Sequence, residues 1–180
     1  MSVTRSEGNR RIDRILRPGF VEGLADLPLD ELRRRRDECH AEREHLSLLR
    51  RLVQGRAEIL KAELDRRDSG GSTGPLVEQL AKVLAPETSR GPSRGEAVRI
   101  EPPPEEMMAA RRRVERLVAD AGISDPGSLG DPQLASAVDL LAREEREVSG
   151  ARSKVLGVLD VFQAELKRRY KEDPGQALDR

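Results

Sequence analysis

Aromatic residues are scarce in this chain of 180 residues, and their scarcity limits the possible folds. Phe, Trp and Tyr together make up 2% of the sequence, and apolar residues of all kinds make up 36%. That is too little bulky apolar mass for a sheet-based core. It is typical of the narrow apolar seams between long charged helices. We therefore expect an all-α protein of one ordinary domain or two small ones.

Cysteine and histidine are equally rare, which bears on redox state and metal binding. The single cysteine, Cys39, rules out an intrachain disulfide and favours a reducing compartment. The only histidines, His40 and His45, are not at the i, i+4 spacing of a helical metal pair, so no metal site is expected. No apolar run is long enough for a signal peptide or a membrane span. We expect a cytoplasmic protein that does not bind membranes.

Net charge is also absent, because 33 basic residues balance 33 acidic ones. A protein that binds nucleic acid directly usually carries a basic excess to neutralise phosphates, so direct nucleic-acid binding is not expected. The sequence shows no nucleophile paired with a base, no metal cluster and no glycine-rich phosphate loop in a strand–helix unit. We therefore do not expect an enzyme.

Two long helices are predicted from apolar residues that recur every seven positions. The first covers residues 26–68, and the second covers 131–171, with Asp131 as its cap and Pro132 in its first turn. The seam of the first helix contains Leu32, Cys39, Leu46, Val53 and Leu60. The seam of the second contains Leu134, Leu141, Val148, Val155 and Phe162.

The remaining segments are shorter, and we expect them to surround a long antiparallel helical hairpin, a coiled coil with short accessory helices. An accessory helix is expected to stop at Gly122. The expected segments are a flexible tail with a short docked segment (1–25), a linker (69–104) containing a short helix (75–85), the accessory helix (105–122) and a C-terminal tail (172–180).

Part of the first long helix recurs in the second, 102 positions later. LSLLRRLVQGRAEILKAELDRR (46–67) aligns with VSGARSKVLGVLDVFQAELKRR (148–169), and nine of the 22 aligned positions are identical. Shared apolar spacing would be unremarkable in two amphipathic helices, but matched polar residues are harder to obtain by chance. Two copies of one polar pattern suggest two halves of one binding site. The paired Gly55 and Gly157 would allow either close helix approach or room for a ligand.

Each copy places its polar residues in one stripe along the helix, since successive residues rotate by about 100°. A charge in a helix seam costs several kcal/mol unless it is paired, so these stripes face either water or a polar ligand. Arginine suits phosphate or a guanine edge, and a carboxylate suits the N1–H and N2–H₂ donors of guanine. The set matches a two-fold symmetric ligand with two guanines and two phosphates. The stripes are Ser47, Arg50, Gln54 and Glu58, and Glu145, Ser149, Arg152 and Asp160.

The stripes resemble the E-x3-S-x2-R-x3-Q-x3-D signature that occurs twice in RsiG-type anti-sigma factors. The second copy departs from it at Leu156, which replaces the amide. The first copy has Glu58 in place of Asp, and Arg43 in place of the leading acid, for which Glu44 or Glu42 could substitute. The strings ELRRRRDE, RRLVQGRAEILKAEL and FQAELKRRY are also similar to that family. The resemblance covers roughly residues 26–68 and 105–171.

This resemblance implies a helical hairpin that binds cyclic di-GMP, as a dimer, between its two motif helices. In that state it would sequester a WhiG-type sporulation sigma factor of actinobacteria from the RNA polymerase core. The two departures imply unequal half-sites. The main alternative is a structural or adaptor coiled coil without a nucleotide ligand, although such a protein has no reason to repeat Ser, Arg and a carboxylate at its seam. A DNA-binding protein is disfavoured by the zero net charge.

Overall fold

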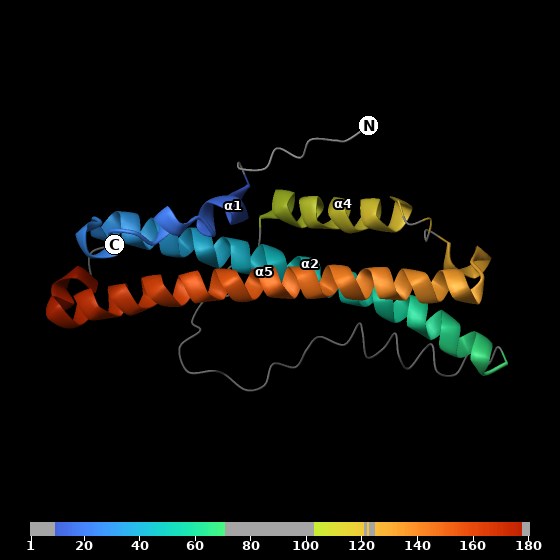
Figure 1. Ribbon diagram of the computed structural model, residues 1–180. Coiled ribbons are helices and arrows are strands. Elements are labelled where there is room, and N and C mark those ends of the chain that lie inside the picture. The colour runs from blue at the N-terminus through green and yellow to red at the C-terminus, as the bar shows by residue number, and fades with distance from the viewer. Residues whose placement is uncertain (1–9, 71–102, 121, 123–124, 178–180) are drawn as a thin grey trace. The chain divides into compact units, whose positions relative to one another are not determined.

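The computed structural model describes residues 10–70, 103–120, 122 and 125–177, and within these ranges every regular element is a helix (Figure 1). The predicted all-α fold is therefore confirmed. The short helix predicted at 75–85 lies outside the described residues. The α-helices are α1 (Arg11–Ile15), α2 (Leu29–Asp68), α4 (Pro104–Asp120) and α5 (Asp131–Glu172). The 3-10 turns are η1 (Pro18–Phe20), η2 (Leu24–Asp26), η3 (Pro126–Ser128) and η4 (Pro174–Ala177).

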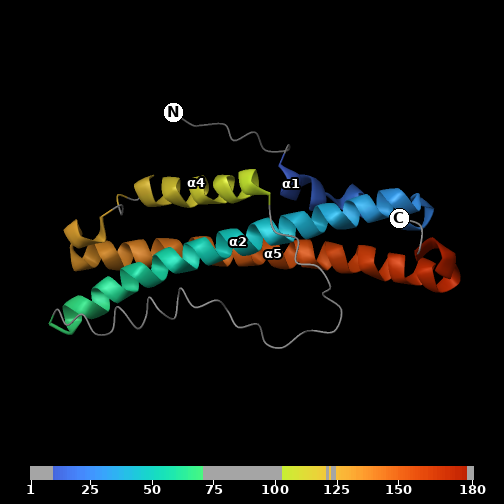
Figure 2. The same cartoon turned by 180° about the vertical axis from the view of Figure 1, so that it is seen from behind.

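The chain forms two compact units, and each contains a segment of α2 and a segment of α5. Unit 1 consists of residues 1–46 and 150–180, and unit 2 consists of residues 47–149. Within each unit, a segment of α2 lies beside a segment of α5 in opposite views (Figures 1 and 2). In unit 1, Arg33 Nε donates to Tyr170 Oη at 3.0 Å, which pairs the start of α2 with the end of α5. The segments in each unit are antiparallel, as the hairpin prediction requires.

The predicted apolar seams form the core. All ten seam positions are buried, and none is more than 3% exposed. Burying a large aliphatic or aromatic side chain contributes about 1.5–3 kcal/mol, so these rows provide most of the force that pairs α2 with α5. The seven-residue spacing was a reliable guide because burial along a helix pair follows that period directly.

The N-terminal segment is packed from α1 onward: Phe20 lies in the short docked segment that was expected, and α1 is packed as well, where a flexible tail was expected. Ile15 in α1 is fully buried, and Phe20 is 8% exposed. Arg11 Nε donates to Glu42 Oε2 at 2.6 Å, and Arg14 forms an ion pair with Glu38. A five-residue helix is not stable alone, so these tertiary contacts with α2 are what hold α1.

The internal duplication extends well beyond the 22 residues visible in the sequence. The turns η2 and η3 are 102 positions apart, and so are the first residues of α2 and α5, Leu29 and Asp131. The ion pair between α1 and α2 recurs in unit 2, where Arg113 Nη2 lies 2.7 Å from Glu144 Oε1. Arg113 belongs to α4, so α4 in the second copy is the counterpart of α1 in the first.

The last turn of each long helix carries an arginine that binds the turn preceding the other long helix. In unit 2, Arg67 donates to backbone oxygens of η3 and its flank: Leu129 at 2.6 Å, Pro126 at 3.0 Å and Gly127 at 3.3 Å. In unit 1, Arg169 donates to the equivalent oxygens of Leu27 at 2.7 Å, Leu24 at 2.7 Å and Ala25 at 3.0 Å. These arginines satisfy carbonyl groups that short 3-10 turns leave open.

The start of α5 differs in detail from the prediction. Asp131 is its first residue rather than its cap, and the carboxylate pairs with Arg67 at 2.9 Å. Gly130 precedes the helix: its carbonyl accepts from the Leu134 N–H at 3.0 Å, and its own N–H donates to Gln133 Oε1 at 2.9 Å. At the other end of the connection, Gly122 follows α4 with a φ of 69°, as expected of a C-terminal glycine.

Candidate functional site

Four residues of the predicted signature meet at the Glu145 carboxylate in unit 2. Glu145 Oε1 accepts hydrogen bonds from Ser149 Oγ at 2.8 Å and from Gln54 Nε2 at 3.3 Å. Arg50 Nη1 lies 3.7 Å from the same oxygen. Each helix presents its two residues four positions apart, on one face. The cluster therefore combines one pair from each motif copy.

Arg50 is the least satisfied member of this cluster. Its Nε atom is buried and has no hydrogen-bond partner among the described residues. An unsatisfied buried donor costs about 1–3 kcal/mol. The Arg50 and Glu145 side chains are 38% and 25% exposed, and an ion pair of this kind contributes about 0–1 kcal/mol. Arg50 is thus only weakly held by Glu145 and keeps donor capacity for an anion.

The equivalent positions in unit 1 have different chemistry. Arg152 corresponds to Arg50, but Leu156 replaces Gln54 and Arg43 replaces Glu145, so the amide–carboxylate pair has no counterpart. Arg43 Nη2 instead lies 2.6 Å from Glu44 Oε1 on its own helix. The exchange of Glu145 for Arg43 changes the formal charge at this position from negative to positive.

The two acids proposed to replace the leading acid of the first motif copy make different contacts. Glu42 is 5% exposed and accepts a hydrogen bond from Arg11 at 2.6 Å, so it takes part in the α1–α2 contact. Glu44 adjoins position 43, where the signature has its leading acid, but the Glu44 carboxylate accepts hydrogen bonds from Arg43. Unit 2 therefore has the leading acid, Glu145, whereas in unit 1 Glu42 binds Arg11 instead.

The remaining signature residues differ in exposure. Glu58 and Asp160 are exposed, farther along their helices than Arg50 and Arg152, and Glu58 Oε1 accepts from Lys61 Nζ at 3.2 Å. Ser47 and Arg152 are half-buried. The structure thus brings Arg50, Gln54, Glu145 and Ser149 together, and places the two guanine-reading carboxylates outside that hydrogen-bonded cluster.

The paired glycines do not mark a close approach of helices. A Cβ atom built on Gly55 or Gly157 would meet nothing within 4 Å. The packing interpretation of these residues is therefore wrong. Each glycine follows a signature position, Gln54 in α2 and Leu156 in α5, and points about 100° around the helix from it.

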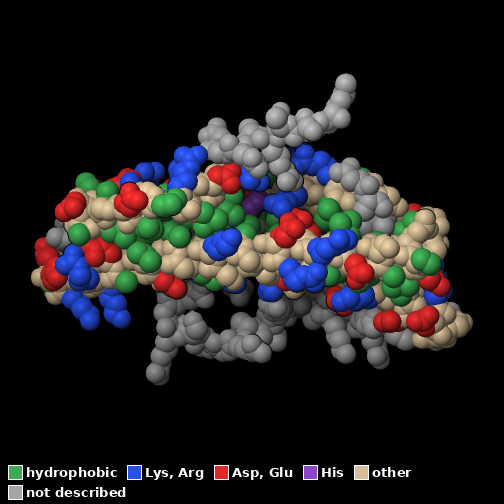
Figure 3. All heavy atoms as spheres, in the orientation of Figure 1, with side chains coloured by type: hydrophobic (Ala, Val, Ile, Leu, Met, Phe, Trp, Pro, Cys, Tyr) green, Lys and Arg blue, Asp and Glu red, His purple; other side chains and the backbone are tan. Residues whose placement is uncertain are grey.

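Other chemistry is limited in the part of the chain that the structure describes. No group of three His, Cys, Asp or Glu side chains there could hold a metal ion, and no helix there is long and apolar enough to cross a membrane. Burial, aided by the Glu42 charge, raises the pKa of the Cys39 thiol to about 12, which makes it a poor nucleophile. Acidic and basic side chains are interleaved on the face shown in Figure 3.

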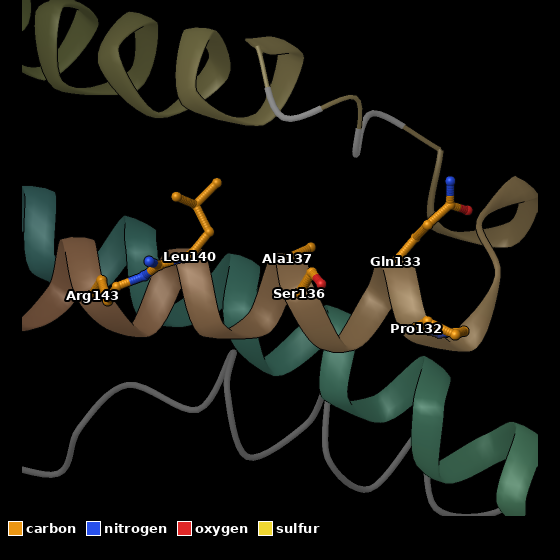
Figure 4. A pocket seen from close by; sticks show the side chains of 6 residues that line it. All are labelled: Pro132, Gln133, Ser136, Ala137, Leu140 and Arg143. Atoms are coloured by element: carbon orange, nitrogen blue, oxygen red, sulfur yellow. The ribbon is translucent and has the colours of Figure 1, made fainter.

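One surface feature was missed by the sequence analysis. A pocket of about 480 Å³ opens on the first three turns of α5 in unit 2 (Figure 4). It would have been found by comparing residues 18–43 with 120–145, where several bulky residues of the first copy align with small ones in the second. Its lining residues are Pro132, Gln133, Ser136, Ala137, Leu140 and Arg143.

These features define a class: a duplicated paired-helix protein in which polar residues from two motif copies share one cluster. The profile of the RsiG-like family matches residues 18–84 and 120–180. The chain belongs to the RsiG-like family, whose role as anti-sigma factors is regulatory rather than catalytic. No curated protein matches the chain.

Proposed function

We propose that this protein is a cyclic di-GMP-responsive anti-sigma factor with a WhiG-type sigma factor as its partner. The observation that carries the nucleotide proposal is the Glu145 cluster, because its four members are the residues that the signature names and they come from both copies. A structural coiled coil would gain nothing from a half-buried arginine whose Nε has no partner.

The chemistry of the cluster suits an anionic guanine nucleotide. A phosphate oxygen or the O6/N7 edge of guanine would supply the acceptor that Arg50 Nε lacks. Because the ion pair with Glu145 is long and exposed to solvent, Arg50 would release it at little cost.

Specificity for guanine would come from the carboxylates Glu58 and Asp160. A carboxylate accepts from the N1–H and N2–H₂ groups of guanine, whereas adenine has an acceptor at N1 and no N2 amine. Both side chains are exposed and therefore accessible to a base. Loss of a bidentate pair costs about 1–3 kcal/mol per base, so cyclic di-AMP should bind much more weakly.

Binding of the sigma factor would follow from filling this site. A bound dianionic ligand would neutralise the arginines and fix the α2 and α5 faces of each unit, which stabilises a surface for the partner. Sequestration would then prevent the sigma factor from joining the RNA polymerase core.

The test is a nucleotide-binding titration of the full chain, alone and with a co-purified WhiG-type sigma factor. Cyclic di-GMP should bind, and it should tighten the complex with the sigma factor by a reciprocal factor. Asp160→Asn should weaken cyclic di-GMP binding and narrow the gap to cyclic di-AMP, since an amide donates where an acceptor is needed. Equal affinity for the two nucleotides would mean that the carboxylates do not read the base. No binding to either would favour the structural coiled coil.

A further inference from the structure

The pocket on α5 has a filled counterpart in unit 1. Counting back 102 positions, the stripe of α5 that lines it corresponds to a stripe of α2 that begins at Asp30 and includes Arg35 and Glu38. In unit 1 the N-terminal segment contacts this stripe. Arg35 Nη1 donates to the Phe20 carbonyl at 2.7 Å, and Arg14 forms an ion pair with Glu38.

An aromatic ring is the main occupant of that place in unit 1. The Phe20 side chain is 8% exposed, and its ring packs edge-to-face against Phe162 with centroids 5.5 Å apart. The Arg35 guanidinium lies over the same ring, 5.4 Å from its centroid. The ring is therefore held by an aromatic contact, a cation–π contact and a hydrogen bond to its own backbone.

In unit 2 the bulky residues of this arrangement are replaced by small ones. Gly122 stands at the position equivalent to Phe20, and Ala137 at the position equivalent to Arg35. Ala137 and Leu140 form an apolar part of the pocket, and Leu140 and Gln133 point from α5 toward the side on which α4 lies (Figure 4). The described part of the second copy thus has neither the ring nor the guanidinium that covers it in unit 1.

The rim of the pocket adds a charge. Arg143 is exposed, and no ion pair is formed by it within the described ranges. The apolar part of the pocket suits an aromatic ring, and the Arg143 guanidinium at its edge suits a carboxylate close to that ring. Such aromatic anchors in pockets carry much of the binding energy in protein interfaces.

We propose that this pocket receives an aromatic side chain from a partner protein, presented on a short turn next to an acidic residue. The template for the occupant is the chain's own Phe20 segment, which packs on Arg35, the counterpart of Ala137, and carries Glu22 two residues after the ring. The pocket uses no residue of the Glu145 cluster, so this docking site is independent of the nucleotide.

The probe is a capped peptide with the sequence RPGFVEGL, residues 17–24, added to the isotope-labelled full chain. Amide shifts of Ser136, Ala137 and Leu140 should move, with a dissociation constant on the order of 1 mM, as expected for one buried ring. The same peptide with Phe20→Ala should leave these shifts unchanged. Equal shifts with both peptides, or shifts confined to residues outside the pocket, would overturn the proposal.

Two variants test the geometry from opposite sides. Ser136→Phe places a ring in the pocket and should weaken peptide binding at least tenfold, whereas Ala135→Phe adds the same ring to the neighbouring exposed position and should not. Ala137→Arg restores the guanidinium found in unit 1 and should tighten binding about threefold. Unchanged affinity in both Ser136→Phe and Ala137→Arg contradicts the assignment.

The competing occupants give different results without any peptide. Pocket shifts that change on dilution would assign the pocket to a second copy of the chain. Pocket shifts that change when residues 75–98 are deleted would assign it to the chain's own linker. Either result overturns docking of a partner's aromatic side chain.

Discussion

Units 1 and 2 share the contacts that hold their helices together, but the residues of their candidate ligand sites differ. The arginines that bind the 3-10 turns, Arg67 and Arg169, make equivalent contacts in the two units. The candidate ligand cluster does not: Gln54 and Glu145 are hydrogen-bonded in unit 2, while their counterparts in unit 1 are Leu156 and Arg43. The residues that hold the helices together therefore match, and those of the candidate ligand cluster do not.

The same contrast appears at the surface. Phe20 packs on Arg35 in unit 1, whereas in unit 2 Gly122 stands at the position of Phe20, and Ala137, at the position of Arg35, lines a pocket. A duplicated scaffold can thus present two different sets of contacts, because the buried seams and the turn-binding arginines recur in both units.

The largest effect is expected where the units agree on ligand chemistry, at Arg50 and Arg152. Replacing both with Ala should lower the affinity for cyclic di-GMP at least 100-fold, since each charge-assisted hydrogen bond contributes about 1.5–3 kcal/mol. Isothermal titration calorimetry measures the affinity, and helical circular dichroism should stay at the wild-type level. Arg51→Ala removes the adjacent exposed arginine and serves as the control. Binding retained in the double variant would remove the arginines from the site.

A smaller effect is expected at the turn-binding arginines, where the units should respond alike. Arg67→Ala and Arg169→Ala should each lower the free energy of unfolding by about 2 kcal/mol, because several carbonyl groups lose a charged donor. Urea denaturation measures this change. Arg66→Ala, which removes an arginine bound to Glu63 on its own helix, should cost less than about 1 kcal/mol. A large difference between the losses of unfolding free energy in Arg67→Ala and Arg169→Ala would show that the two turn contacts are not equivalent.

Giving unit 1 the half-site residues of unit 2 should lower the affinity for cyclic di-GMP about tenfold at low salt. Arg43→Glu with Leu156→Gln gives unit 1 the pair found in unit 2 and places a negative charge near an anionic ligand, so binding should weaken. The effect should shrink as salt is raised, because exposed charges are screened. Arg51→Glu makes the same charge change outside the signature. A salt-independent loss would indicate damage to packing instead of charge.

The smallest effect concerns Glu63 and Glu165, which occupy equivalent positions. Hydrogen bonds from two neighbouring arginines lower the pKa of each carboxyl to about 2, from an ordinary value of 4.5. Because the folded pKa is the lower one, the stabilisation is present above pH 4.5 and is lost as the pH falls toward 2. Glu63→Gln with Glu165→Gln should therefore flatten the fall in unfolding free energy between pH 5 and about 2.5 in urea titrations. If the free energy of unfolding of the double variant falls as steeply with pH as that of the wild type, these ion pairs are screened by solvent.

The seams and the motif stripes could be predicted because each depends on one helix at a time. Seven-residue spacing identified Leu32 and Phe162 as core, and rotation per residue put Arg50 and Gln54 on one face. The meeting of Gln54 with Glu145 could not be predicted, since it depends on the register between two helices. The packing of α1 was missed because RIDRIL (11–16) is too short to show a period. Its match to RVERLV (113–118), at the same 102-residue offset, was the available signal.

Each unit contains the start of one copy and the end of the other, and this has a consequence for how the chain is held together. Residues 10–70 and 103–177 relate to one another as the two partners of a tethered complex. The covalent connection raises the effective concentration of one copy for the other, and a chain cut between the copies keeps every described seam residue and both turn-binding arginines. Two fragments expressed separately should then reassemble into the same pair of units, with a stability that depends on their concentration.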